Sequence, residues 1–426
     1  MDHFCYHGDT LFCEDVSLSH IAQQVGTPFY CYSEATLLHH LAVFGEAFAG
    51  YPHLVCYSVK ANSNLAVLDA LVRHGAGLDV VSGGELFRGQ KVGCAANKMV
   101  FSGVGKREDE IRAALQAGIL MFNVESVAEL HRINRVAGEM GLKAPVALRV
   151  NPDVDAKTHP HISTGLRRNK FGIPFGKALQ VYRQAQRMPH LQVIGLDCHI
   201  GSQVTTINPF VEALKRVMEL LKQLRGEGIP IRYLDLGGGL GIPYGQEESK
   251  IPPHPSLYAG ALLQELQGSD LTLILEPGRV IVGNAGIFVV RVEYIKEGEE
   301  KNFIVTDGGM NDMMRPALYD AYHTILPVQR HFSDDEMVAD VVGPICESSD
   351  FFARERLLPR FEEGDLLAVR STGAYGFTMS SNYNSRPRVA EVMVRGGAFQ
   401  VIRRRETLEQ LVENEALFAP LAGEGV

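Results

Sequence analysis

The stretch Tyr57-Ser58-Val59-Lys60-Ala61-Asn62 ends an apolar run, Leu54-Val55-Cys56, and places a lysine directly after it. The segment from Leu65 to Arg73 follows, with apolar residues at spacings of three and four. A short apolar run followed by this helical spacing is typical of a βα unit. The stretch therefore predicts a parallel strand that carries a lysine at its carboxyl end.

The same pattern, a short apolar run followed by helical spacing, recurs along the chain. Eight apolar runs are found: Leu54 to Val59, Leu78 to Val81, Met99 to Ser102, Leu120 to Val124, Val146 to Val150, Val193 to His199, Tyr233 to Leu236 and Leu271 to Leu275. Helical spacing between them is clearest at Leu65 to Arg73, Ile111 to Ala117, Val127 to Met140 and Phe210 to Leu224. Eight βα units in succession predict an α/β protein with a closed (β/α)8 barrel.

The pattern changes after Val282, where short strand-like runs follow one another without long helices. These runs are Ile287 to Ile295, Phe303 to Thr306, Met337 to Val342, Leu366 to Val369 and Val389 to Val394. The early run Phe29 to Tyr32 can add a further strand to the same region. We therefore predict a barrel over residues 35–283 and a mostly β domain, of the sandwich or barrel type, from residues 1–34 and 284–426.

Composition excludes several classes of protein. The 426 residues are 46% apolar, carry a formal charge of -9 and contain no block of Lys or Arg, so nucleic acid and anionic lipid are not expected partners. The N-terminus Met1-Asp2-His3-Phe4-Cys5 lacks a cationic segment followed by an apolar one, and no run is long enough to span a membrane. The seven cysteines show neither disulfide nor metal-ligand spacing. We expect a cytoplasmic protein with reduced thiols and no metal.

In barrels of this kind, catalytic groups lie at the carboxyl ends of the strands, and the loops after strands seven and eight commonly bind phosphate. The residues at these places are Lys60 after the first strand, His199 at the end of the sixth, Gly237-Gly238-Gly239 after the seventh and Glu276-Pro277-Gly278-Arg279 after the eighth. They provide an amine for a Schiff base, a flat ring, a phosphate cradle and a carboxylate. Pyridoxal phosphate requires these four groups.

Taken singly, each of these residues has an ordinary structural explanation. Lys60 alone would be a solvated surface lysine, His199 a buried core histidine, and the three glycines a tight turn. Glu276 differs, because a buried carboxylate is costly without a partner, and a protonated pyridine nitrogen is one. A lysine that bonds to a cofactor must be partly neutral, so we expect the barrel mouth to lower the pKa of Lys60.

Taken together, these motifs resemble those of the fold type III pyridoxal phosphate enzymes, and among them the diaminopimelate decarboxylase family. The resemblance spans nearly the whole chain. It rests on the four motifs that contain Lys60, His199-Ile200-Gly201-Ser202-Gln203, Gly237-Gly238-Gly239 and Glu276-Pro277-Gly278-Arg279, and on the segment Gly343-Pro344-Ile345-Cys346-Glu347-Ser348. It implies pyridoxal 5'-phosphate as the cofactor and a homodimer whose active sites are shared between subunits.

The resemblance also implies a role for each matching residue. Lys60 would hold the cofactor, His199 would stack on its ring and Glu276 would pair with its nitrogen. Gly239, Gly278, Arg279 and Tyr375 would bind the cofactor phosphate or lie beside it, with Ser202 as a further candidate, and Gly237 and Gly238 would belong to the same cofactor-binding turn. The substrate would be bound by Arg279, Arg315, Tyr319, Glu347 and Tyr375. Cys346 would return a proton to Cα after carbon dioxide has left.

The reaction implied is decarboxylation of meso-2,6-diaminopimelate to L-lysine, the last step of lysine biosynthesis. Arg315 and Tyr319 stand four residues apart, so on a helix they share one face and can hold a distant carboxylate, while Glu347 takes the ammonium. Three alternatives stay open: a decarboxylase of ornithine or arginine, an amino-acid racemase on a similar barrel, and a non-catalytic regulator that binds pyridoxal phosphate. The long loop at residues 151–172 is either a mobile lid or an ordinary surface loop.

Overall fold

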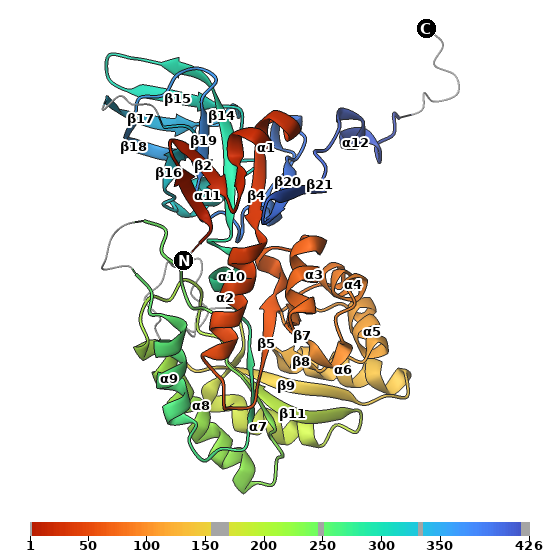
Figure 1. Cartoon of the computed structure of the whole chain (residues 1–426). Coiled ribbons are helices and arrows are strands. Elements are labelled where there is room, and N and C mark those ends of the chain that lie inside the picture. The colour runs from red at the N-terminus through yellow and green to blue at the C-terminus, as the bar shows by residue number, and fades with distance from the viewer. Residues whose placement is uncertain (1, 155–169, 246–250, 331–334, 419–426) are drawn as a thin grey trace, which may run out of the picture.

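The computed structural model describes residues 2–154, 170–245, 251–330 and 335–418. The chain forms a barrel of strands and helices and a second part built mainly of β-strands, which lies beside the mouth of the barrel (Figure 1). No helix in these described ranges is long and apolar enough to cross a membrane.

The barrel is a parallel sheet of eight strands that closes on itself, because β13 pairs with β5 and β8 pairs with β9. Its strands are β5 (His53–Ser58), β6 (Gly77–Val80), β7 (Met99–Phe101), β8 (Met121–Val124), β9 (Ala144–Asn151), β11 (Leu191–Asp197), β12 (Tyr233–Asp235) and β13 (Thr272–Leu275). A two-residue strand, β10 (Ile173–Pro174), pairs in parallel with the carboxyl end of β9. All eight predicted barrel strands are confirmed.

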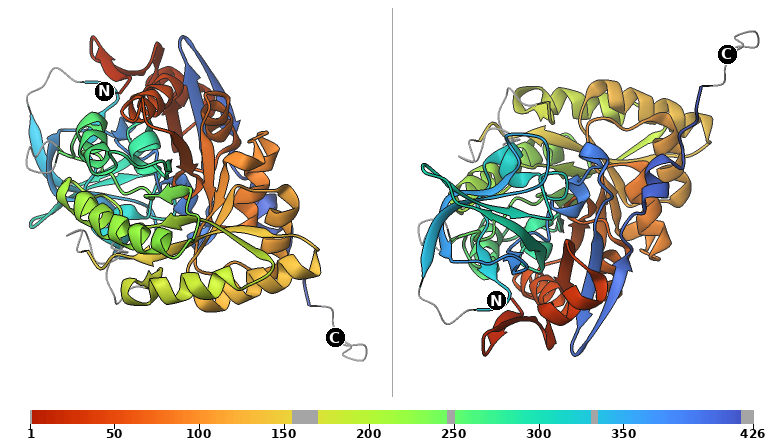
Figure 2. Two further views of the ribbon diagram at one scale, coloured as in Figure 1. Left: turned by 90° about the horizontal axis from the view of Figure 1, so that it is seen from below. Right: turned by 90° about the horizontal axis from the view of Figure 1, so that it is seen from above.

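Helices lie around the outside of these strands (Figure 2). They are α2 (Glu34–Glu46), α3 (Leu65–Arg73), α4 (Gly83–Lys91), α5 (Glu108–Ala117), α6 (Val127–Glu139), α7 (Phe175–Gln186), α8 (Asn208–Gly226), α9 (Pro255–Glu265) and the short α10 (Arg279–Val282). The chain turns from β5 into α3 through a 3-10 turn, η1 (Val59–Ala61), which contains Lys60. Asn64 caps α3 by accepting from the Ala66 N–H, so the turn that presents Lys60 is fixed on both sides.

The second part contains a large sheet whose path runs β18-β17-β15-β14-β4-β20-β21, with β19 paired to β14 and β16 paired to β19. Its strands are β4 (Phe29–Ser33), β14 (Gly286–Lys296), β15 (Asn302–Thr306), β16 (Ile325–Pro327), β17 (Glu336–Val342), β18 (Phe351–Pro359), β19 (Leu366–Val369), β20 (Ala390–Arg395) and β21 (Ala398–Arg403). The early run at Phe29 does join this sheet, between β14 and β20. The predicted fold class, a barrel plus a mostly β region, is confirmed.

Smaller elements complete this part. They are the three-stranded sheet β1 (Phe4–His7), β2 (Thr10–Cys13) and β3 (Val16–Ser17), and the helices α1 (Leu18–Val25), α11 (Arg315–Tyr319) and α12 (Leu408–Val412). The sequence interpretation missed β18, whose middle carries Arg354, Glu355 and Arg356 and so lacks an apolar run. It also missed β21, in which three of the six residues are exposed and none is buried, so that its residues alternate only weakly.

The barrel interior has an apolar layer below a polar one. The apolar layer is formed by Cys56, Val100, Met121, Ala147, Ile194 and Ile274. Side chains two residues apart on a strand point to the same face. The residues two positions further along five of these strands are Ser58, Ser102, Asn123, Arg149 and Glu276, and all five are buried. The strand ends therefore deliver a polar layer inside the mouth of the barrel.

Candidate active site

Lys60 lies at this mouth and is paired with Asp79. Its Nζ is 2.8 Å from the Asp79 Oδ2, and 38% of the Lys60 side chain is exposed whereas that of Asp79 is fully buried. Burial acts to lower the pKa of Lys60, but the carboxylates of Asp79 and Glu276 outweigh it and raise the pKa above its usual value. Our expectation of a lowered pKa was wrong. The described groups nearest to this amine are anionic rather than cationic.

Glu276 directly follows β13 and is held inside the polar layer. Its Oε1 accepts hydrogen bonds from Ser102 Oγ and Asn123 Nδ2, both at 3.1 Å. The same Asn123 nitrogen donates to Asp235 Oδ2 at 2.9 Å, so two carboxyl groups share one amide. Burial, followed by the negative charge of Asp79, raises the pKa of Glu276 to about 7. Glu276 is thus a carboxyl group that can change charge near neutral pH.

His199 follows β11 and contacts the glycine turn after β12. Its Nδ1 accepts the Gly238 N–H at 3.1 Å, so in the neutral ring the proton is on Nε2. Burial, and then the charges of Arg149 and Lys60, lower the pKa of His199 well below its usual value. The imidazole is therefore neutral at physiological pH, with a fixed tautomer and orientation.

The three glycines have different roles in the structure. The Gly237 N–H donates to Asp235 Oδ1 at 2.9 Å, and the Gly238 N–H is used by His199. The Gly239 N–H has no acceptor within the described ranges, which makes it the glycine of the three that can meet an anion. A Cβ at Gly238 would lie 2.2 Å from the Glu276 carbonyl oxygen, so close packing between strand ends requires glycine there.

Arg279 lies after β13 and is surrounded by hydroxyl groups. One guanidinium nitrogen donates to Tyr244 Oη and the other to Ser202 Oγ, the latter at 3.1 Å. The Tyr375 ring lies 4.8 Å from the Arg279 guanidinium, and the Tyr375 N–H donates to the Ala61 carbonyl at 2.8 Å. These contacts bring Arg279, Ser202 and Tyr375 to the turn that carries Lys60.

Arg315 and Tyr319 form the two ends of α11, as the four-residue spacing predicted. Arg315 is buried, and its guanidinium lies 4.6 Å from the centre of the Tyr244 ring. Tyr319 is half-buried and close enough to Arg279 to affect the pKa of that guanidinium. Helix α11 therefore places a second cation beside Arg279.

Tyr244 links these two arginines and was missed by the sequence interpretation. Burial acts to raise the pKa of its phenol, but the charges of Arg279 and Arg315 outweigh burial and lower it. Neither arginine forms an ion pair with a carboxylate among the described residues. The available sequence signal was only its position, five residues after the glycine turn of the seventh strand. Two neighbouring cations without a described countercharge form a site for an anion.

Cys346 and Glu347 are separate from this group. Both are exposed, in the loop between β17 and β18. The Cys346 N–H donates to Asn384 Oδ1 at 2.8 Å, and Tyr383 Oη donates to Glu347 Oε2 at 3.4 Å. Within the described ranges, no hydrogen bond or ion pair joins either residue to the group around Lys60.

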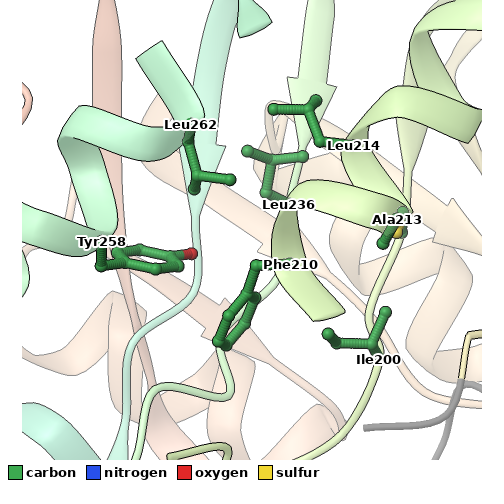
Figure 3. A pocket seen from close by; sticks show the side chains of 8 residues that line it. Ile200, Phe210, Ala213, Leu214, Leu236, Tyr258 and Leu262 are labelled. Carbon is green, nitrogen blue, oxygen red and sulfur yellow. The ribbon is translucent and has the colours of Figure 1, made fainter. Parts of the chain in front are cut away.

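A small apolar pocket lies behind the glycine turn, between α8 and α9 (Figure 3). Its lining is almost wholly hydrophobic, with the rings of Phe210 and Tyr258 approaching each other edge to face at 4.8 Å. An ideal Cβ on Gly239 would lie 3.5 Å from the Phe210 ring. The pocket thus supports the turn from behind rather than forming part of the polar site. The predicted lid, residues 151–172, falls largely outside the described residues.

Comparison with known proteins agrees with this geometry. Residues 34–283 match the family described as pyridoxal-dependent decarboxylase, pyridoxal binding domain. The barrel and its strand-end lysine thus define a pyridoxal-dependent decarboxylase by class.

A diaminopimelate decarboxylase from Vibrio cholerae is 56% identical over 96% of this chain and 98% of its own length. The crystal structure of diaminopimelate decarboxylase from M. jannaschii in complex with L-lysine is 39% identical, covers 98% of both chains and has a TM-score of 0.92. The corresponding Helicobacter pylori structure with L-lysine is 43% identical over 93% of this chain and 98% of that one, with a TM-score of 0.89. The chain belongs to the diaminopimelate decarboxylase family.

Proposed function

We propose that the protein decarboxylates meso-2,6-diaminopimelate to L-lysine, the last step of lysine biosynthesis, with pyridoxal 5'-phosphate as cofactor. The observation that carries this proposal is the pair of buried cations Arg279 and Arg315, joined by Tyr244, close to the turn that presents Lys60. The cofactor phosphate beside Arg279 and a second substrate carboxylate, far from the reacting carbon, beside Arg315 would together satisfy such a pair. Ornithine and arginine have no second carboxylate.

Four features of the barrel mouth fit the cofactor. Lys60 is partly exposed, Glu276 is a buried carboxyl with a pKa of about 7, and the Gly239 N–H is available to an anion. The Arg279 Nε is buried and has no hydrogen-bond partner among the described residues. When bound, pyridoxal phosphate supplies an aldehyde for a lysine amine and a ring that accepts the electrons released as the carboxylate leaves.

The roles we propose follow from these positions. Lys60 would hold the cofactor covalently, and Glu276 would pair with its ring nitrogen. His199, neutral and fixed by Gly238, would contact the ring. Gly239, Gly278, Arg279, Ser202 and Tyr375 surround the phosphate, whereas Gly237 and Gly238 shape the turn from within.

We assign the distal end of the substrate to Arg315, with Tyr319, Arg279 and Tyr375 beside it. The reacting end needs a proton donor, and Cys346 is exposed on the second part of the chain, next to Glu347. Exposed groups of this kind are accessible to a second copy of the chain. We therefore propose a homodimer in which Cys346 and Glu347 complete the partner's active site.

The names of the relatives agree with this substrate and product. Two solved relatives were crystallised with L-lysine, the product expected here. The seven cysteines are all free thiols, which fits the cytoplasm as the proposed location.

The test is a comparison of carbon dioxide release from meso-diaminopimelate, lysine, ornithine and arginine by the protein loaded with pyridoxal phosphate. Because only meso-diaminopimelate pairs with both Arg315 and Glu347, its kcat/KM should exceed the others by roughly a hundredfold or more. Arg315→Gln should reduce this preference, whereas Arg73→Gln, on the outer surface, should not. Equal turnover of ornithine by the wild type would overturn the proposal.

A further inference from the structure

Behind Arg315 lies a histidine to which neither the sequence motifs nor the proposed mechanism assigns a role. His323 follows α11 in the chain and is fully buried, and Arg315 Nη1 lies 2.8 Å from its Nε2. Its Nδ1 lies 2.7 Å from the Arg370 carbonyl oxygen. His323 therefore connects the guanidinium to the backbone at the end of β19.

These two contacts determine the protonation of the ring. A carbonyl oxygen only accepts, so Nδ1 carries the hydrogen and donates it to Arg370. A guanidinium only donates, so Nε2 is the acceptor for Arg315. Burial, followed by the charge of Arg315, lowers the pKa of His323 well below its usual value. The ring is neutral and present as a single tautomer.

A neutral acceptor has a specific effect on Arg315. A carboxylate in this place would orient the guanidinium but would also neutralise its charge. The imidazole orients it and leaves the positive charge uncompensated, as a site for an anionic substrate group requires. Tyr244 adds a second constraint, because its ring lies 4.6 Å from the Arg315 guanidinium and meets the His323 ring edge to face at 5.0 Å.

We propose that His323 is a positioning residue that sets substrate specificity by holding the Arg315 guanidinium toward the distal carboxylate. This inference rests on the proposed function, since it assumes that Arg315 binds that carboxylate. His323 itself touches neither substrate nor cofactor. Its effect should therefore appear in the binding of the dicarboxylate and not in the chemical step.

Two substitutions separate the two hydrogen bonds of the ring. His323→Asn keeps an amide near the Nδ1 position, which can still donate to Arg370, but does not reach Arg315. His323→Gln is longer and can place an amide oxygen near the Nε2 position, so it restores the acceptor. Steady-state kinetics with meso-diaminopimelate and inhibition by L-lysine, whose carboxylate is the retained distal one, would be measured for both variants.

We expect His323→Asn to raise the KM for meso-diaminopimelate and the inhibition constant of L-lysine by roughly tenfold or more. The kcat should change by less than about threefold, because an interaction present in both ground and transition states affects KM alone. His323→Gln should keep both constants within about threefold of wild type. The absorbance of bound pyridoxal phosphate should be equal in all three proteins.

A fall in kcat with unchanged KM in His323→Asn, or an equal defect in both variants, would overturn the positioning role. If His323→Asn does not fold, His323→Phe, which keeps the ring volume and lacks the acceptor, takes its place with the same expectations. Absence of carbon dioxide release from meso-diaminopimelate by the wild type would overturn the proposed function as well. Wild-type activity with an unchanged KM in His323→Asn would overturn only the role of His323.

Discussion

The Lys60 amine is held by the Asp79 carboxylate at 2.8 Å; Lys60 lies in the turn directly after β5, and Asp79 lies in the neighbouring strand β6. Strands β5 and β6 pair so that Ser58 lies opposite Asp79, and Ser58 Oγ donates to the same carboxylate oxygen at 2.8 Å. The register of these two strands therefore places a fixed negative charge beside the Lys60 amine. This charge raises the pKa of Lys60 despite burial, which acts to lower it.

Replacing Asp79 by Asn should lower the pKa of Lys60, because the carboxylate is lost and the effect of burial remains. An amine must be unprotonated to attack an aldehyde, so cofactor-free Asp79→Asn should form the covalent bond to pyridoxal phosphate at lower pH. We expect the pH at which this rate reaches half of its maximum to fall by roughly one unit or more. Absorbance after rapid mixing would follow the reaction, with Asp270→Asn as an exposed control. An unchanged or higher midpoint would contradict the role of Asp79.

Lys60→Ala should abolish covalent attachment of the cofactor and reduce turnover to background, since no other proposed site residue is an amine. Borohydride reduction of the yellow protein, digestion and peptide mapping would locate the label. Lys222→Ala, in which an exposed lysine on α8 outside the site is lost, should keep label and activity. Finding the label on any lysine other than Lys60 would show that the assignment is wrong.

Glu276 predicts a pH-dependent stability of the cofactor-free protein. Its pKa is about 7 in the folded state, against the ordinary glutamate value of 4.5, so the folded protein binds the proton more tightly than the unfolded chain. The free energy of unfolding should therefore fall as the pH rises from 4.5 to 7. At about 1.4 kcal/mol for each pKa unit, the loss is about 3 kcal/mol.

In Glu276→Gln the carboxyl group is replaced by an amide, which does not titrate in this pH range. The free energy of unfolding of this variant should rise relative to wild type across the same interval, as measured by urea denaturation at several pH values. The exposed control Glu219→Gln should follow the wild-type curve. Parallel curves for wild type and Glu276→Gln would contradict the raised pKa.

Gly238→Ala should destabilise the barrel, because the new Cβ would lie 2.2 Å from the Glu276 carbonyl oxygen, a backbone atom that cannot move alone. We expect a loss of about 1–3 kcal/mol, as found for overpacked cores. Gly260→Ala is the matched control, since its Cβ meets nothing within 4 Å on α9. This control should be neutral or stabilise the helix by up to about 1 kcal/mol in thermal or chemical denaturation. Equal stabilities of the two variants would contradict the packing argument.

The proposed shared active site predicts complementation between inactive variants. Lys60→Ala and Cys346→Ala should each be nearly inactive, because one lacks the amine and the other the proton donor. In a mixed dimer, one of the two sites contains both intact residues. Random exchange puts about half of the dimers in the mixed state, so activity should return to roughly a quarter of wild type.

Lys60→Ala mixed with Glu276→Gln is the control, because both residues lie in the barrel of the same subunit and no mixed site is intact. This mixture should recover no activity beyond that of its components. If subunit exchange is demonstrated and the mixture of Lys60→Ala and Cys346→Ala also recovers no activity, Lys60 and Cys346 act within one chain.

The sequence by itself determined the eight barrel strands and the groups at their ends. Apolar runs followed by helical spacing are local patterns, and the carboxyl ends of parallel strands meet at one mouth whatever the loops contain. Lys60, His199, Glu276 and Arg279 could therefore be placed together before any coordinates. Strands β18 and β21 could not be predicted from the sequence, because their stability comes from pairing with neighbouring strands and not from an apolar run of their own.

Only the tertiary structure decided the electrostatics and the supporting contacts of the site. Whether the pKa of Lys60 is raised or lowered depends on which strand lies beside β5. The register that brings Asp79 next to Lys60 cannot be obtained from the sequence. Tyr244 and His323 have no motif, since a tyrosine and a histidine become partners of Arg315 only when the loop after β12 and the segment after α11 meet in space. Such contacts between distant segments depend on the packing of the whole chain, and no local pattern of residues encodes them.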